Sequence, residues 1–227
     1  MLTPVEQMLF VFLALLAIGA TIHGFNEMYL IINRGTGSLR FNNLLARLWK
    51  ALTVYLTQKT TLKTRRLSSL FHLGIVWGFT YYFLVNAVDV LYGFIPSFED
   101  TLKSFGILYD LFRLGADVLS IAVLGGVTYF LLRRFFLPNK TELQYHDNVL
   151  LHPRVKAGAI SVDSLIVGIF ILVHVGARFL GEAVYVAQHG GDAWMPFATF
   201  ISPLFSGASP DGLEVLRHFF WWMALGG

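Results

Sequence analysis

The chain has 227 residues, of which 56% are hydrophobic and 14% charged, and its mean hydropathy is +0.62. This composition excludes an ordinary soluble domain and predicts an all-α membrane protein. The small net charge of +3 comes from Lys and Arg residues beside apolar runs, which indicates membrane orientation and no nucleic-acid partner. The chain has no cysteine, so it cannot ligate an iron–sulfur cluster through thiolates, and histidine is the candidate ligand for any redox centre.

The first apolar run, Val5 to Ile32, lacks a basic leader and a small-residue cleavage pattern. It is therefore predicted to be a retained helix rather than a signal peptide. His23 lies toward its Arg34 end. Its imidazole is a candidate ligand, a proton-handling group or a packed polar side chain, and the last is the use we favour.

The segment from Asn33 to Arg66 is the most basic part of the chain. By the positive-inside rule it is cytoplasmic, which places the N-terminus outside. Its middle carries apolar residues at helical spacing: Phe41, Leu44, Leu45, Leu48, Leu52, Tyr55 and Leu56. This pattern predicts an amphipathic helix on the inner membrane surface. That helix either docks a soluble partner or only attaches the chain to the membrane.

The second run, Leu67 to Leu91, has no charge before Asp89 and is long enough to cross a hydrocarbon core of about 30 Å. His72 lies one turn inside it, and Gly74 and Gly78 would let a flat ligand approach the backbone. The imidazole is either an axial ligand for haem or an interfacial histidine that finds a hydrogen bond.

A short outer loop, Tyr92 to Phe105, leads to the third run, Ile107 to Leu132, and Arg133 and Arg134 then return the chain to the cytoplasm. The third run opens with charged residues that share one helix face: Asp110, Arg113 and Asp117. They serve either as a structural staple, which is the commoner use, or as part of a proton-exchange site.

The fourth run, Ala159 to Ala187, has His174 near its midpoint, where an unpaired histidine is expensive. Arg178, one turn further on, is a candidate to pair with Glu182 or with a cofactor carboxylate. Residues 188–212 form a Gly, Pro and Ser-rich outer segment that is re-entrant or lies on the surface.

The fifth run begins at Leu213 and contains His218. About fifteen residues cover roughly 22 Å, less than the hydrocarbon core, so we expect the natural polypeptide to continue beyond Gly227. Residues 1–227 thus form one domain, predicted as a bundle of about five transmembrane helices plus the amphipathic helix. In this arrangement His174 and His218 reach the same depth from opposite ends. They are the best internal pair for a bis-histidine haem, whereas His72 has only His23.

Four short motifs carry a family resemblance: RRLSSLFHLGIVWGF from Arg65, HPRVKAG from His152, GEA from Gly181 and RHFFWW from Arg217. They resemble the membrane cytochrome b of the respiratory nitrate reductase gamma-subunit family, and most closely the membrane subunits of heterodisulfide-reductase-like complexes. The resemblance covers most of the chain. It implies a five-helix bundle that holds b-type haem and passes electrons between a quinone pool and cytoplasmic iron–sulfur centres.

Carried over residue by residue, the resemblance makes His72 the cytoplasmic-side haem ligand, with its partner beyond Gly227. The family's second ligand pair falls where this chain has Tyr82 and Ala224. The ordinary outer haem is therefore either absent or rebuilt with other histidines. Lys103, in the outer loop, is a candidate for contacting a quinone carbonyl.

The predicted function is a membrane electron-transfer subunit of a quinone-linked oxidoreductase in the inner membrane of a prokaryote. It would bind one or two haem b groups and exchange electrons with a quinone and with a cytoplasmic iron–sulfur protein or fused domain. Protons would move through Asp110, Asp117 or Glu182. The competing predictions are a haem-free membrane anchor for a soluble partner and a small-solute carrier.

Overall fold

The computed structural model describes residues 2–37, 42–63, 65–137 and 152–226. Within these ranges the chain forms helices and no strands, as predicted. Four helices are long and apolar enough to cross a membrane, which indicates a membrane protein: α1 (Pro4–Ile32), α4 (Arg66–Phe94), α6 (Ile107–Phe135) and α8 (Ala159–His189).

The predicted fifth run forms α10 (Pro210–Leu225), a helix of 16 residues. Ser209 is its N-cap residue: the hydroxyl oxygen accepts a hydrogen bond from the backbone N–H of Gly212 at 3.2 Å. At a rise of about 1.5 Å per residue it is about 24 Å long. It is thus shorter than the four membrane-length helices, and the five-span bundle remains a prediction.

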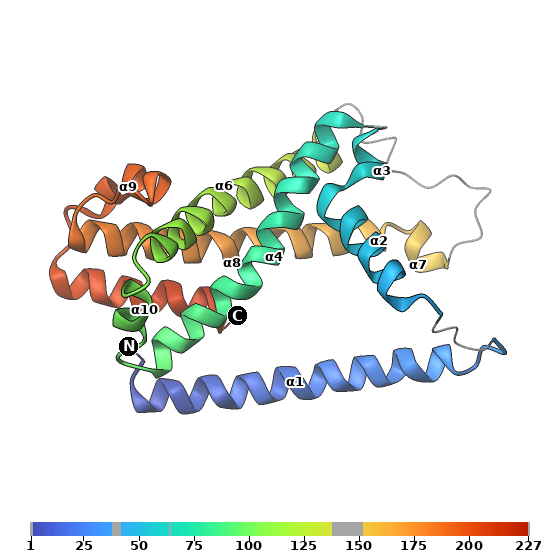
Figure 1. The fold of residues 1–227 in the computed structure, drawn as a ribbon, viewed down its shortest axis with the longest axis horizontal. Coiled ribbons are helices and arrows are strands. Elements are labelled where there is room, and N and C mark those ends of the chain that lie inside the picture. Colours follow the sequence, from blue (N-terminus) through green and yellow to red (C-terminus); the bar gives the residue numbers. More distant parts are fainter. Residues whose placement is uncertain (1, 38–41, 64, 138–151, 227) are drawn as a thin grey trace.

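Helices α4 and α6 pack closely because glycine removes side-chain bulk where they cross (Figure 1). A Cβ atom on Gly78 would collide with Cγ2 of Val123, and one on Gly74 would lie 3.3 Å from Cβ of Ala122. The prediction that these glycines admit a flat ligand is therefore wrong. The space beside them is filled by α6.

Helix α1 lies apart from the other long helices along most of its length (Figure 1). Its first turns hold it in place: the Gln7 side-chain amide donates to the backbone oxygen of Gly93 at 3.0 Å. The Phe10 ring also packs edge-on against Trp221, with ring centroids 5.3 Å apart. From Leu15 to Ile32 every residue of α1 is exposed within the chain.

The predicted amphipathic helix forms as α2 (Leu44–Thr57), followed by the short α3 (Lys59–Leu62), while Phe41 lies outside the described residues. The Tyr55 hydroxyl is 2.8 Å from that of Thr80, and the Trp77 indole N–H donates to the backbone oxygen of Leu56 at 2.8 Å. Trp77 and Thr80 lie about 16 and 21 Å along α4 from its start. The end of α2 is therefore beside the middle of α4, not level with its start as a purely surface helix would be.

Short helices complete the described fold: α5 (Phe98–Lys103), α7 (Pro153–Lys156), α9 (Pro196–Ile201) and the 3-10 helix η2 (Ser202–Phe205). The last two belong to the segment predicted as re-entrant or surface-lying. They pack on α8, and α9 also contacts α6. Met195 and Ala198 are buried in this contact together with Phe179 of α8. Residues 192–205 thus form a covering segment over one end of the bundle.

Candidate functional site

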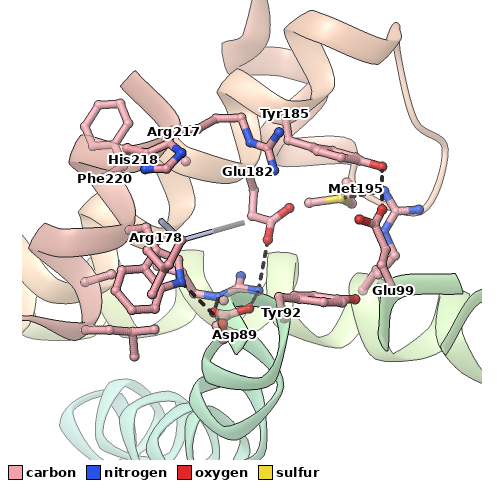
Figure 2. Close-up of a pocket in the computed structure, with 18 of the residues that line it drawn as sticks. Asp89, Tyr92, Glu99, Arg178, Glu182, Tyr185, Met195, Arg217, His218 and Phe220 are labelled. Carbon is pink, nitrogen blue, oxygen red and sulfur yellow. Dashed lines mark hydrogen bonds and ion pairs between the residues drawn. The ribbon is translucent and has the colours of Figure 1, made fainter. Parts of the chain in front are cut away.

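A cavity of about 200 Å³ lies where the C-terminal parts of α4 and α8 meet the first half of α6 and one side of α10 (Figure 2). Leu2, just before α1, and Glu99 of α5 also line it. Its wall combines charged and aromatic side chains, including Asp89, Tyr92, Arg178, Glu182, Tyr185, His218 and Trp221. A concave site with apolar walls and a few convergent polar groups is the usual form of a ligand-binding site.

Arg178 is the charged centre of this wall and is only 9% exposed. Its Nε donates to Oδ2 of Asp89 at 2.8 Å, and its Nη2 donates to Oε1 of Glu182 at 3.0 Å. A charge at this depth in a membrane helix needs partners, because an unpaired charge there is expensive. The cluster has two carboxylates for one guanidinium, so one proton can be held in it without leaving a net charge.

The pairing of Arg178 with Glu182 follows from their spacing of one helical turn, and the structure forms this predicted pair. Asp89 is the partner that the sequence analysis missed. The signal was present, because Asp89 is the only charge in the run from Leu67 to Leu91 and so required a buried partner. Which helix would supply that partner could not be read from the sequence.

His218 is held between two carboxylates on the α10 side of the cavity. Its Nδ1 is 3.1 Å from Oε1 of Glu6, and its Nε2 is 3.4 Å from Oε1 of Glu214. Glu6 also accepts a hydrogen bond from the indole N–H of Trp222 at 3.1 Å. Both imidazole nitrogens are thus occupied, and Glu6 joins α1 to α10.

His174 does not line the cavity. Its Nδ1 is buried without a hydrogen-bond partner, and its ring stacks on Phe170 of the same helix. A Cβ on Gly181 of α8 would lie 3.4 Å from Cβ of Phe220 on the antiparallel α10, which places these two residues level. From this register, His174 and His218 lie about 13 Å apart along the helix axes.

The predicted pairing of His174 with His218 is therefore wrong, because the register of α8 on α10 separates them and carboxylates occupy both nitrogens of His218. These residues do not fit a haem held between the two histidines. The Nδ1 of His174 is buried without a hydrogen-bond partner. This imidazole is therefore still a candidate ligand, but without His218 as the second ligand.

His72 lies on the exposed side of α4, edge-on to the Phe130 ring of α6. His23 is not brought to it. The imidazole of His23 is 77% exposed on α1 and lies 3.5 Å from the Glu27 carboxylate of the same helix. The pairing of His72 with His23 is therefore absent from the described fold, and His72 is likewise a single candidate ligand.

Tyr82, where the predicted resemblance implies a second ligand on this helix, is a buried core residue. Its hydroxyl lies 2.7 Å from Oγ of Ser120 on α6, and Arg178 lies over its ring at 5.8 Å from the centroid. Ala224, at the corresponding partner position, is also buried. Both positions are filled by packing among α4, α6, α8 and α10.

Lys103 does not line the cavity. Its Nζ pairs with Oε1 of Glu99 at 2.8 Å. The Tyr185 hydroxyl donates to the same oxygen at 3.3 Å (Figure 2). Burial alone would raise the pKa of Glu99, but the hydrogen bond and charge of Lys103, with the Tyr185 hydroxyl, hold it below its ordinary value. The hydrogen bond to Glu99 raises the pKa of Lys103, against a smaller effect of burial. Lys103 therefore orients a cavity carboxylate and does not itself face a ligand.

Substituting Glu99→Gln should lower the pKa of Lys103 and speed its acylation by an amine-reactive reagent at pH 9 by roughly 1.5- to 5-fold, the range of an exposed ion pair. The lowered pKa of Glu99 means that the pair is intact above pH 4.5 and is lost as the pH falls through the lowered value. The raised pKa of Lys103 means that it is lost again only above pH 10.5. Mass spectrometry of labelled peptides measures the rate, with Lys156 as internal reference. An unchanged Lys103 rate would contradict the pairing.

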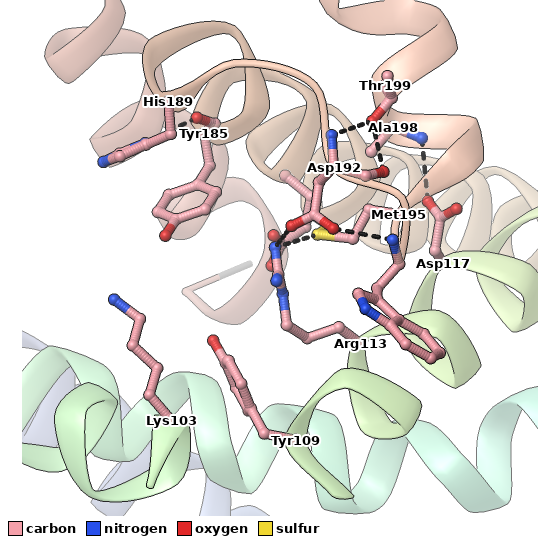
Figure 3. Close-up of polar contacts among 12 residues, drawn as sticks. Lys103, Tyr109, Arg113, Asp117, Tyr185, His189, Asp192, Met195, Ala198 and Thr199 are labelled. Carbon is pink, nitrogen blue, oxygen red and sulfur yellow. Dashed lines mark hydrogen bonds and ion pairs between the residues drawn. The ribbon is translucent and has the colours of Figure 1, made fainter. Parts of the chain in front are cut away.

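Arg113 and Asp117 hold the covering segment onto α6 (Figure 3). Arg113 pairs with Asp192, and its Nη2 lies 3.0 Å from the sulfur of Met195. The carboxylate of Asp117, which is 2% exposed, accepts the backbone N–H groups of Phe197 at 2.8 Å and Ala198 at 3.0 Å. It therefore caps the first turn of α9.

Arg113 and Asp117 therefore act as a structural staple, which is the commoner of the two uses predicted for these charges. A proton-exchange role for Asp117 is not supported, because both oxygens are engaged by α9 and the side chain does not line the cavity. Asp110 does not line the cavity either. Of the predicted proton carriers, only Glu182 faces it.

Substituting Asp117→Ala should cost about 1–3 kcal/mol of stability, because two backbone donors lose their acceptor. Residues 192–205 should become more sensitive to limited proteolysis in detergent. Asp110→Ala, two turns earlier on the same helix, is the matched control and should leave the cleavage rate of this segment close to wild type. Equal cleavage of both variants would show that the cap does not hold the segment.

Comparisons with protein-family models, with curated proteins and with solved structures find no match for this chain. The resemblance described from the sequence motifs therefore remains a prediction.

Proposed function

We propose that this protein is a membrane electron-transfer subunit that exchanges electrons with a quinone bound in the charged cavity. The observation that carries the proposal is the cluster of the buried Asp89 and Arg178 with the partly buried Glu182, in a wall that also carries aromatic and apolar side chains. A quinone has an apolar ring, two carbonyl oxygens that accept hydrogen bonds, and a reaction in which two protons accompany two electrons. The cavity offers matching groups for each of these properties.

Proton transfer is the step that this chain's own residues can support. Glu182 faces the cavity and is the carboxylate in excess of the Asp89–Arg178 pair. It can take a proton as a quinol is oxidised, or give one as a quinone is reduced, while Arg178 keeps a carboxylate partner in both states. Glu214 and His218, on the same wall, offer a second protonatable pair.

The electrons require a one-electron centre within the complex. The sequence resemblance implies haem b, for which His72 and His174 are the candidate ligands, together with a cytoplasmic iron–sulfur protein or fused domain. Haem supplies one-electron steps between such a centre and a two-electron quinone. We further propose that the protein lies in the inner membrane of a prokaryote, with the cavity near the outer face of that membrane.

A haem-free membrane anchor is the second candidate. It is favoured by the carboxylates on both nitrogens of His218 and by the packed Tyr82 at the family's second ligand position. The absorption spectrum of the purified protein separates the two candidates. A reduced b-type band that is lost on substituting His72 or His174 supports the first, and the lack of any such band in a preparation made with haem available supports the anchor.

Quinone binding is tested without any partner by quenching of tryptophan fluorescence. Trp221 lines the cavity, whereas Trp49 of α2 is 73% exposed and distant from it in sequence and fold. A short-chain menaquinone or ubiquinone analogue should quench saturably in the wild type and in Trp49→Phe, and much less in Trp221→Phe. Quenching that is linear with concentration, or equal in both variants, would reject the cavity as the quinone site.

A further inference from the structure

The hydrogen bonds around His218 fix which ring nitrogen carries the proton when the imidazole is neutral. Oε1 of Glu6 lies 3.1 Å from Nδ1 of His218 and also accepts the indole N–H of Trp222. The other oxygen of Glu6 accepts the backbone N–H of Thr3 at 2.7 Å and its hydroxyl at 2.8 Å. A carboxylate among these donors can only accept, so Nδ1 must donate to it. Nε2 of the neutral ring is therefore left with a lone pair.

Nε2 of His218 lies beside a carboxylate at the mouth of the cavity. It is 3.4 Å from Oε1 of Glu214, which is one turn earlier on α10. Both residues line the cavity, and Figure 2 shows His218 on its α10 side. The Glu214 side chain is 50% exposed, whereas that of His218 is 28% exposed. His218 therefore connects the cavity with a carboxylate that reaches the surface.

The charges around His218 are balanced when its ring is protonated. Glu214 faces His218 with Oε1 and Arg217 with Oε2, the latter at 3.5 Å from Nη1. Glu6 and Glu214 supply two carboxylates and Arg217 one guanidinium, so an imidazolium brings the group to zero charge. Across the cavity lies the second group with two carboxylates and one guanidinium: Asp89, Arg178 and Glu182. Each group can thus hold one proton without leaving a net charge.

We propose that His218 is the second proton carrier of the cavity, and that Glu6 is the positioning residue that keeps its Nε2 free for the proton. This inference rests on the proposed quinone site. When a quinol is oxidised, its two electrons pass to the haem b or iron–sulfur centre of the complex and its two O–H bonds break. One proton goes to Glu182, and the other forms an N–H bond at Nε2 of His218. Glu214 then takes that proton and releases it to the solution outside, and quinone reduction reverses these steps.

Turnover with the native partners tests the role of His218. His218→Asn should lower the rate of quinol oxidation by about 10²- to 10⁴-fold, because an amide cannot carry the proton. Its NH₂ group takes the place of Nδ1–H and still donates to Glu6. Added imidazole should restore most of the lost rate in a saturable way, whereas sodium chloride at equal ionic strength should restore none. His23→Asn removes an exposed imidazole that also lies one turn from a glutamate, and it should behave as wild type.

A measurement on the purified protein needs neither quinone nor partner. The ¹⁵N NMR shifts of labelled histidine show which ring nitrogen is protonated, and the signal of His218 is the one lost in His218→Asn. At a pH where the ring is neutral, the wild type should carry the proton on Nδ1. Glu6→Gln should shift it toward Nε2, because an amide can donate to Nδ1. Thr3→Ala removes the other half of the α1 capping box but keeps the Glu6 carboxylate, and it should leave the proton on Nδ1.

The outcomes separate this inference from the quinone site. Wild-type turnover in His218→Asn, a defect that imidazole does not restore, or a proton on Nε2 in the neutral wild type would overturn the role of His218. The quinone site would stand in each of these cases as long as the analogue still quenches Trp221 saturably. A wild type without saturable quenching would reject the quinone site, and the role of His218 with it.

Discussion

Substituting Arg178→Met should lower the free energy of unfolding by about 3–5 kcal/mol, the cost of leaving buried charges without their partner. Asp89 and Glu182 would then face each other across the space that the guanidinium now fills. The effect is large because Asp89 is buried and the Glu182 side chain is only 27% exposed. Unfolding by SDS in mixed micelles, followed by tryptophan fluorescence, measures it.

A triple variant separates this electrostatic effect from a packing defect. Combining Arg178→Met with Asp89→Asn and Glu182→Gln removes all three charges while keeping side chains of similar size. If the loss in the single variant comes from unpaired carboxylates, the triple variant should recover most of the stability, since buried ion pairs often contribute little net stability. A triple variant as unstable as Arg178→Met would show that the guanidinium acts through packing and hydrogen bonds to neutral groups.

Substituting Glu182→Gln should reduce quinone turnover by about 10²- to 10⁴-fold, the usual contribution of a positioned acid or base. The amide cannot release a proton, but its oxygen can still accept from Arg178, and Asp89 and Arg178 remain a balanced pair. Stability should therefore change by less than about 1.5 kcal/mol. The rates of quinol oxidation and quinone reduction are measured in membranes that contain the variant with its native partners.

Two further measurements make this prediction specific. Asp100→Asn removes a carboxylate from α5 outside the cavity wall and should leave turnover unchanged. The fluorescence assay with Trp221 should show that Glu182→Gln still binds the quinone analogue, so that the loss is in proton transfer. Turnover of Glu182→Gln close to wild type would reject Glu182 as the proton carrier, although the quinone could still bind in the cavity.

The quinone cavity holds a cation beside two carboxylates, which suits a neutral ligand that takes up or releases protons.

The helices were predictable because the signal for them is local. A membrane-length apolar run needs only its own composition to be recognised, and the runs from Val5, Leu67, Ile107 and Ala159 begin within one residue of α1, α4, α6 and α8. The pair of Arg178 and Glu182 was predictable for the same reason, since residues one turn apart meet on any helix. The cap of Asp117 on α9 was not predictable in detail, because its two partners are backbone groups 80 and 81 residues away.

By itself, the sequence determined that this chain is helical, that it is suited to a membrane, and that polar side chains such as those of Asp89 and His218 need partners there. Only the tertiary structure decided what those partners are. The register of α8 on α10 separates His174 from His218, and the close packing of α4 on α6 fills the space beside Gly74 and Gly78. Hydropathy depends on each helix alone, whereas register depends on how the side chains of two helices fit together. The candidate site is therefore the cluster of Asp89, Arg178 and Glu182 and not a histidine pair.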